Sequence, residues 1–238
     1  MKLLFLLFSG VKFSKLIFSV GTMLLTIWVY AQLYGTKFAV GFVVMILIHE
    51  LGHYAAARQR NLDVSLPAFI PFVGAYINLR EHPHDAETEA YVAFAGPFVG
   101  TLAAFAAFWH ANATGNDLWM ALAYSGFMLN LFNMIPLSPL DGGRITQVLS
   151  PRIWLLGVPM LIALFMYRPS PMIFLIGIMA LPNVLAAWRM GFKKNEPDGY
   201  RDIPEATRYE YMLMYLGLTG FLAIMTYESH LLLKHVSF

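Results

Sequence analysis

The chain contains no cysteine among its 238 residues. This absence excludes disulfide bonds, thiolate metal ligands and cysteine nucleophiles. A metal ion bound by this protein would therefore depend on histidine and carboxylate side chains, the other common ligands of zinc.

Charged residues are also scarce. They make up 13% of the sequence and hydrophobic residues 58%, a balance well outside that of ordinary soluble domains. The formal net charge of +2 is small, and we expect no nucleic-acid partner. The composition indicates a multi-pass integral membrane protein surrounded by the lipid bilayer. The length suits one membrane domain over residues 1–238.

Apolar segments of near-spanning length recur along the chain, and we expect helices at residues 13–33, 37–57, 90–110, 118–136, 153–167, 171–188 and 211–227. The sequence thus predicts an all-α polytopic membrane protein with about six to seven transmembrane helices. The fifth segment is short, so it could form a partly crossing hairpin with the sixth. The opening run Met1–Phe8 is too short to span the bilayer, and it predicts an interfacial strand or helix rather than a signal peptide.

The sixteen basic residues are distributed unevenly between the predicted loops. If the N-terminus is cytoplasmic, thirteen of them lie inside and three lie outside, namely Lys37, Arg168 and Lys234. Cytoplasmic loops carry an excess of lysine and arginine, so this orientation is favoured. We expect a prokaryotic cytoplasmic membrane, with the candidate site described next facing the cytoplasm.

The most informative motif is His49-Glu50-Leu51-Gly52-His53, which follows the apolar run Phe38–Ile48. On an α-helix His49 and His53 are one turn apart, so their imidazoles can reach one metal ion. Glu50 projects to one side, where it can act as the base that accepts a proton from water. Ionisable side chains in hydrocarbon are costly, so three within five residues need a reason such as metal binding.

A catalytic zinc site requires a third protein ligand and an open position. The best candidate for the third ligand is Asp141, which follows Pro136 and Pro139 at the end of the fourth apolar segment. The prolines break the helix there. The fourth segment ends on the same side of the membrane as the second, so the topology brings Asp141 to the depth of His49.

Three motifs together resemble those of the site-2 protease family of intramembrane zinc metalloproteases: His49-Glu50-Leu51-Gly52-His53, Ala95-Gly96-Pro97 and Asn133-x-x-Pro136-x-x-Pro139-Leu140-Asp141-Gly142-Gly143. The resemblance covers a three-helix catalytic core of about residues 36–150 and leaves 151–238 as accessory helices. It implies one zinc ion (Zn2+) per chain, bound by His49, His53 and Asp141, with Glu50 as catalytic base and acid. It also suggests that Asn133 contacts the substrate backbone or the oxyanion. The chain has no room for PDZ or CBS domains, so we expect a minimal form.

The segment Leu66–Leu79 is apolar but contains two prolines and a glycine, which makes a spanning helix unfavourable. We expect a re-entrant, β-like loop near the active site, with a strand over Val73–Leu79. A protease holds its substrate extended, and strand addition to an exposed edge is a general way to do so. This makes Gly74, Ala75 and Tyr76 candidate substrate-binding residues. The alternative is a lid or packing loop without substrate contact.

Some residues allow other interpretations. Asn133 could be a buried amide that joins helices, and Gly96-Pro97 a kink and close-packing site. We expect His82 and His84 to be solvated loop residues. The remaining histidines outside the motif should lie on the outer side of the membrane, namely His110, His230 and His235.

The expected function is hydrolysis of a peptide bond in or near a transmembrane segment of another membrane protein, close to the cytoplasmic face, as in regulated intramembrane proteolysis. One alternative is a metal transporter, which would spread polar residues along several spans. Another is an inactive homologue that binds membrane clients, against which the intact Glu50 argues. A third zinc ligand from Glu205, Glu210 or Glu228 is a weaker alternative, because no motif surrounds them.

Overall fold

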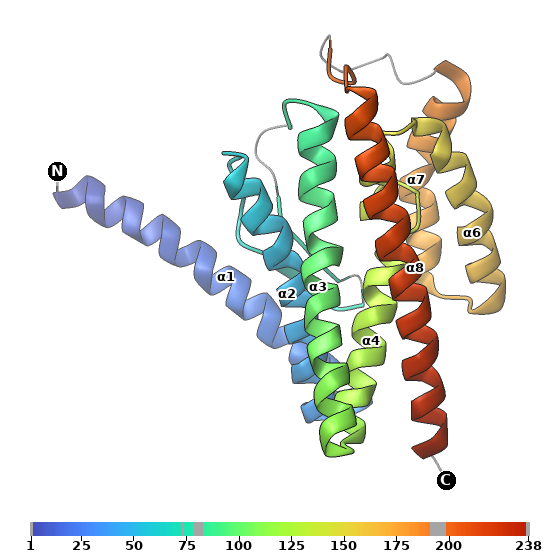
Figure 1. Ribbon diagram of the computed structural model, residues 1–238. Coiled ribbons are helices and arrows are strands. Elements are labelled where there is room, and N and C mark those ends of the chain that lie inside the picture. The colour runs from blue at the N-terminus through green and yellow to red at the C-terminus, as the bar shows by residue number, and fades with distance from the viewer. Residues whose placement is uncertain (1, 73, 79–82, 191–198, 237–238) are drawn as a thin grey trace.

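Helices dominate the computed structural model, which describes residues 2–72, 74–78, 83–190 and 199–236 (Figure 1). Within these ranges eight α-helices, one 3-10 helix and one β-hairpin follow one another in this order: α1 (Lys2–Tyr34), α2 (Thr36–Gln59), β1 (Ala68–Ile70), β2 (Gly74–Tyr76), α3 (Ala86–Thr114), α4 (Asp117–Asn133), α5 (Asp141–Thr146), η1 (Pro151–Ile153), α6 (Trp154–Tyr167), α7 (Pro171–Met190) and α8 (Glu205–Val236).

Every predicted apolar segment lies largely in a helix, which confirms the all-α polytopic architecture. In the described part of the chain, five helices are long and apolar enough to cross a membrane, and these are α1, α2, α3, α7 and α8. α4, with 17 residues, and α6, with 14, are shorter than that. α4 ends at Asn133 because Pro136 and Pro139 follow, although the apolar sequence continues to Pro136. Within the described residues five helices thus reach spanning length by length and composition, and α4 and α6 are shorter apolar helices.

The opening run of the chain is helical and is not a separate element. α1 begins at Lys2 and continues without a break to Tyr34, where Gly35 with a φ of 81° separates it from α2. Its N-terminal half extends away from the other helices (Figure 1). Of the two conformations predicted for this run, residues 2–8 adopt the helix and not the strand.

Small residues allow the central helices to approach closely. α3 packs between α2 and α4, and α4 in turn packs against α8. Ala90, Ala93 and Ala104 of α3 are fully buried in this core, and Gly52 of α2 lies against the backbone of Ala95. Close packing of small residues is the usual basis of helix association in membranes, where lipid is as apolar as the side chains.

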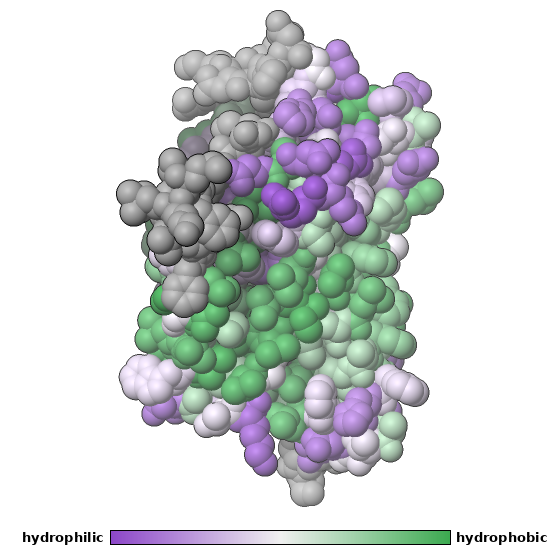
Figure 2. All heavy atoms as spheres, turned by 90° about the vertical axis from the view of Figure 1, so that its left-hand side faces the viewer, coloured by the Kyte–Doolittle hydropathy of each residue, from purple (hydrophilic) through white to green (hydrophobic). Residues whose placement is uncertain are grey.

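Apolar side chains gather in a band across the face shown in Figure 2, with hydrophilic residues above and below the band. The upper end of the molecule in Figure 1 carries the C-terminal end of α2, the N-terminal ends of α3 and α8, and α5. This band is the distribution expected of a protein that crosses a bilayer, and it agrees with the spanning length of five helices.

The segment predicted to be extended forms a two-stranded antiparallel hairpin. Its register pairs Ala68 with Tyr76, Phe69 with Ala75, and Ile70 with Gly74. Of the predicted strand Val73–Leu79, residues 74–76 form β2, while 73 and 79 lie outside the described residues.

Helix α1 holds this hairpin in place. The Ser19 hydroxyl donates to the carbonyl oxygen of Pro67 at 2.5 Å, and the backbone N–H of Phe72 donates to the Tyr30 hydroxyl at 3.0 Å. The Phe69 side chain is buried in an apolar cluster with residues of α1 and α2. The hairpin is therefore part of the packed structure, against α1 and α2.

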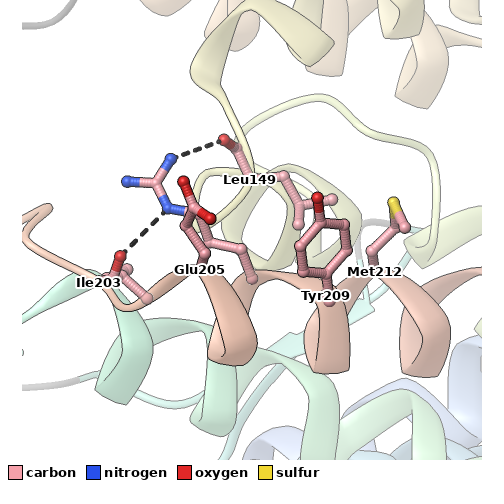
Figure 3. A pocket seen from close by; sticks show the side chains of 6 residues that line it. Leu149, Ile203, Glu205, Tyr209 and Met212 are labelled. Atoms are coloured by element: carbon pink, nitrogen blue, oxygen red, sulfur yellow. Dashed lines mark hydrogen bonds between the residues drawn. The ribbon is translucent and has the colours of Figure 1, made fainter.

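The turn before α8 is tied to the segment after α5 by Arg208 (Figure 3). Its Nε donates to the carbonyl oxygen of Ile203 at 3.3 Å, and a terminal nitrogen donates to that of Leu149 at 3.4 Å. A third bond reaches the carbonyl oxygen of Arg201. The pocket of about 520 Å³ beside these bonds shares no lining residue with the site described below.

Candidate metal centre

Helix α2 presents the two histidines of the motif on one face, near its C-terminal end. His49 and His53 are each 4% exposed, and their Nε2 atoms are 3.1 Å apart. They are four positions apart in the sequence, about one helical turn, so the rings lie one above the other on the helix. The two imidazoles therefore point to the same place inside the helical bundle.

Asp141 meets the histidines from a distant part of the sequence. Its Oδ2 lies 3.2 Å from Nε2 of His49 and 3.2 Å from Nε2 of His53. It is the first residue of α5, and the turn that leads to it is tight. Added Cβ atoms at Gly142 and Gly143 would collide with the backbone of residues 134–138. Only glycine therefore allows the chain to fold back and deliver this carboxylate.

The three atoms form a triangle with edges of 3.1, 3.2 and 3.2 Å. In a tetrahedral zinc site with bonds of about 2.0–2.1 Å, ligand atoms are about 3.3–3.4 Å apart. Nδ1 of His53 donates to the carbonyl oxygen of Val92 at 2.8 Å, so its Nε2 carries a lone pair. Two imidazoles and one carboxylate thus converge on one point, and this donor set fits zinc.

Glu50 stands apart from this triangle. Its carboxylate lies within 4.8 Å of ligand atoms of both histidines, yet in the described structure it forms no ion pair with them. The side chain is 6% exposed and borders the same cavity as the histidines. This placement suits a proton acceptor next to the ligands better than a fourth ligand.

A cavity of about 250 Å³ opens on the triangle. One wall is β2, with Gly74, Ala75 and Tyr76 among the lining residues. Helix α7 also lines the cavity, with the side chains of Met172, Ile176 and Met179. The three predicted strand residues and the histidines therefore border one space.

Asn133 also lines this cavity, but in the described structure it has no hydrogen bond to the histidines or to Asp141. Its Nδ2 donates to the carbonyl oxygen of Leu129 at 3.0 Å, within α4. The amide that contacts a histidine is Asn130, one turn earlier, whose Oδ1 lies 2.8 Å from Nδ1 of His49. Asn130 was not predicted from the sequence, although a polar amide within an apolar helix is a recognisable signal.

A second group of polar residues surrounds Asp141 on the side away from the histidines. Arg144 approaches Oδ1 of Asp141 at 3.9 Å and donates from Nε to Oε1 of Glu89 at 3.2 Å. The Tyr200 hydroxyl donates to the other Glu89 oxygen at 2.6 Å. Arg144 also lines the cavity. The sequence analysis did not identify these residues, because they come from α3, α5 and the loop before α8.

Gly96 packs against the metal-facing side of His53. An added Cβ at this position would collide with the His53 ring, including Nε2. The prediction of a close-packing site is therefore confirmed, and the partner is a candidate ligand. Pro97 lies inside α3, which continues through it to Thr114.

Other histidines and carboxylates take no part in the triangle. His110 lies edge-on to Trp119 with ring centroids 4.9 Å apart, and His230 stacks on Tyr124 at 5.3 Å. His84 is exposed, and Glu205 lies in the first turn of α8 beside the separate pocket of Figure 3. The positions of the His82 and His235 side chains fall outside the described residues.

The sequence is similar to those of known zinc metalloproteases. Residues 37–116 match the family model of peptidase family M50. A zinc metalloprotease of Methanocaldococcus jannaschii is 30% identical over 111 residues, which cover 44% of this chain and 32% of that protein. The stage IV sporulation protein FB of Bacillus subtilis is 28% identical over 110 residues, which cover 45% of this chain and 38% of that protein.

These alignments therefore span about a third of the length of the curated relatives. Among solved structures, the site-2 protease from Methanocaldococcus jannaschii aligns with a TM-score of 0.45 and 17% identity, covering 74% of this chain and 88% of that one.

Proposed function

We propose that this chain, a member of peptidase family M50, is an intramembrane zinc metalloprotease that hydrolyses a peptide bond in or near a transmembrane segment of another membrane protein. The observation that carries the proposal is the triangle of His49, His53 and Asp141, with ligand atoms 3.1–3.2 Å apart. The Glu50 carboxylate stands beside it, at one side of a cavity.

In this proposal one zinc ion per chain is held by His49, His53 and Asp141. The bound ion would supply a Lewis acid that polarises a peptide carbonyl and lowers the pKa of water. Three protein ligands leave a position open, which distinguishes a catalytic zinc site from a closed structural one.

Glu50 accepts the proton of the attacking water and passes it to the leaving amine. Its position supports this role, because it lies within 4.8 Å of the histidine ligand atoms without being paired to them. A carboxylate already held by a cation would be a poorer base. The same side chain can serve both steps, since the proton it gains is the one the amine needs.

The substrate binds as an extended strand along β2. Within the described residues β2 pairs with β1 alone, so its other edge has no strand partner, and Gly74, Ala75 and Tyr76 line the cavity. A helical substrate hides its carbonyl groups in internal hydrogen bonds, whereas an added strand exposes them. Substrate segments with helix-breaking residues near the scissile bond should therefore be favoured.

Asn133 borders the same cavity and is proposed to contact the substrate backbone or the oxyanion. Its Nδ2 carries two hydrogens and the bond to Leu129 uses one of them, which leaves a second donor. The interpretation as a helix-joining amide fits Asn130 better, since Asn130 is the residue that links α4 to α2.

The site faces the cytoplasm of a prokaryotic cell in this proposal. His49 lies nine residues before Arg58, which is about 14 Å along α2. Arg58 is in the last turn of α2. Arg144 contacts Glu89 in the first turn of α3, and Arg208 lies in the first turn of α8. The N-terminal ends of α3 and α8 lie at this same end of the molecule (Figure 1). The positive-inside rule assigns such an end to the cytoplasm. The whole of 1–238 forms one domain, with a catalytic core over about 36–150 and accessory helices over 151–238.

A metal transporter is a weaker interpretation. In the described residues, the buried histidines and carboxylates are His49, Glu50, His53 and Asp141, and all belong to one site. A transport path would require further polar groups along the spans. An inactive client-binding homologue would have no need to keep Glu50 unpaired beside the ligands.

The decisive experiment compares membranes that contain the active protein with membranes that contain Glu50→Gln. We expect soluble fragments of membrane proteins to appear only with the active protein, cut near the cytoplasmic end of a transmembrane segment. The glutamine variant should retain its zinc, because the base is removed and the ligands stay. Identical fragment patterns in the two membranes, at equal protein and zinc content, would contradict the proposal.

A further inference from the structure

Asn130 of α4 lies fully inside the bundle, at 1% exposure, and touches the site through a single hydrogen bond. Its Oδ1 is 2.8 Å from Nδ1 of His49, the ring nitrogen that does not point at His53 and Asp141. The contacts of Asn130 determine which nitrogen of His49 is available.

The orientation of the Asn130 amide follows from its second contact. Nδ2 donates to the backbone carbonyl oxygen of Gly126 at 2.7 Å, and a carbonyl oxygen can only accept. The amide oxygen is therefore the atom turned toward His49. Since an amide oxygen also only accepts, the shared proton resides on Nδ1 of His49.

This arrangement leaves the lone pair of His49 on Nε2, the atom that lies 3.1 Å from Nε2 of His53 and 3.2 Å from Oδ2 of Asp141. We propose that Asn130 is a positioning residue that holds His49 in the tautomer and ring orientation that bind zinc. The inference rests on the proposed function, because it concerns the metal ion of that site.

The packing around the Asn130 amide fixes its position. Gly100 of α3 lies directly behind it, and an added Cβ there would collide with the Asn130 amide group. The amide is thus enclosed by α3 on one side, by its own helix at Gly126 on another, and by His49 of α2 on the third. A side chain held in this way has lost its rotamer freedom before metal binding, which lowers the entropic cost of ordering the ligand.

The two histidines differ in what orients them. His53 is oriented by the backbone carbonyl of Val92, which no substitution removes, whereas His49 is oriented by a side chain. Groups that orient metal ligands in this way typically contribute ten- to hundredfold to metal affinity. A change at Asn130 should therefore weaken zinc binding through His49 alone.

The test measures zinc affinity of the purified full chain by competition with a chromophoric chelator. Asn130→Leu keeps a similar volume but cannot accept the bond, and we expect zinc to bind about ten- to hundredfold more weakly. Asn130→Asp keeps an acceptor at this position and should retain affinity within severalfold of the wild type. Thr101→Val is the matched control, because Thr101 is buried in α3 and, within the described part of the chain, its hydroxyl donates to its own helix at Pro97.

Thermal unfolding with zinc bound and in excess chelator separates positioning from a general loss of stability. If Asn130 positions His49 for zinc, Asn130→Leu should lower the unfolding midpoint more with zinc bound than in chelator, because part of its effect is on zinc binding. A merely structural role would lower the midpoint equally in both conditions. If Asn130→Leu fails to fold, Gly100→Ala displaces the amide from the other side and should weaken zinc binding in the same direction.

Wild-type zinc affinity in Asn130→Leu, or an equal loss of thermal stability with zinc bound and in chelator, would overturn the inference. Either result leaves the proposed function standing, provided that His49→Ala itself loses zinc. Absence of zinc from the wild-type protein would instead refute the proposed function.

Discussion

Replacing Gly96 by alanine tests whether the helix backbone of α3 limits the metal site. The added Cβ would overlap the His53 ring at Nε2, Cε1 and Cδ2. His53 cannot easily withdraw, since its Nδ1 is bonded to the Val92 carbonyl and its side chain is 4% exposed. The strain should therefore appear at the metal-binding nitrogen.

The expected magnitude follows from two opposing effects. Alanine in a helix interior is favoured over glycine by about 1 kcal/mol, but this gain is the same with and without zinc and therefore cancels in the zinc affinity. Overpacking in a buried site costs about 1–3 kcal/mol, and a displaced ligand adds the loss of metal binding. We expect zinc affinity to fall by roughly ten- to hundredfold, at 1.4 kcal/mol for each factor of ten, with a parallel loss of proteolysis.

The assay is chelator competition on purified Gly96→Ala, together with thermal unfolding in the presence and absence of chelator. Gly217→Ala on α8 is the control, because a Cβ there meets nothing within 4 Å and the helix should become slightly more stable. Gly96→Ala protein that binds zinc as tightly as the wild type would refute the overlap argument, since α3 would then have room for the methyl group.

Three further predictions concern the ligands, the topology and the polar group around Asp141. His49→Ala and His53→Ala should lose most bound zinc and Asp141→Asn should bind it more weakly; zinc at the wild-type level in the double histidine variant would exclude this site. Single cysteines at Gln59 and Thr114 of this cysteine-free chain should react with impermeant reagents from opposite sides of the membrane, the first from the cytoplasm. Labelling of both from one side would show that α3 does not cross. Glu89→Gln should lower the free energy of unfolding by about 1–3 kcal/mol, because Arg144 and Tyr200 lose a charged partner, whereas Glu205→Gln, at an exposed position, should change little in thermal unfolding.

Much of the fold could be predicted because its signals are local. A run of apolar residues indicates where a helix forms in a membrane protein, and each predicted segment lies largely within a helix. The ends of helices were less well predicted, since hydropathy continues past Asn133 while the prolines stop α4 there. The hairpin was indicated by two prolines and a glycine in an otherwise apolar segment.

The convergence of His49, His53 and Asp141 was also within reach of the sequence. The histidines are one helical turn apart, and the alternation of spans brings Asp141 to the same end of the molecule. Asn130 and the Glu89–Arg144–Tyr200 contacts were not predicted. They depend on the rotation of each helix about its axis and on a loop far along the chain, and neither is encoded in local patterns.

Helix α3 supplies none of the three proposed ligands, yet its residues determine how the histidine ligands are oriented and how much space they have. Val92, Gly96 and Gly100 are spaced four residues apart, so they occupy one face of the helix. The first orients His53 through its carbonyl, the second leaves room for the His53 ring, and the third leaves room for the amide that orients His49. A side chain at Gly96 would press on the His53 ring, whereas one at Gly100 would press on the Asn130 amide. Gly96→Ala and Gly100→Ala should therefore lower zinc affinity by independent routes, and their effects should add in the double variant; a double variant no weaker than Gly96→Ala alone would show that both act on one ligand.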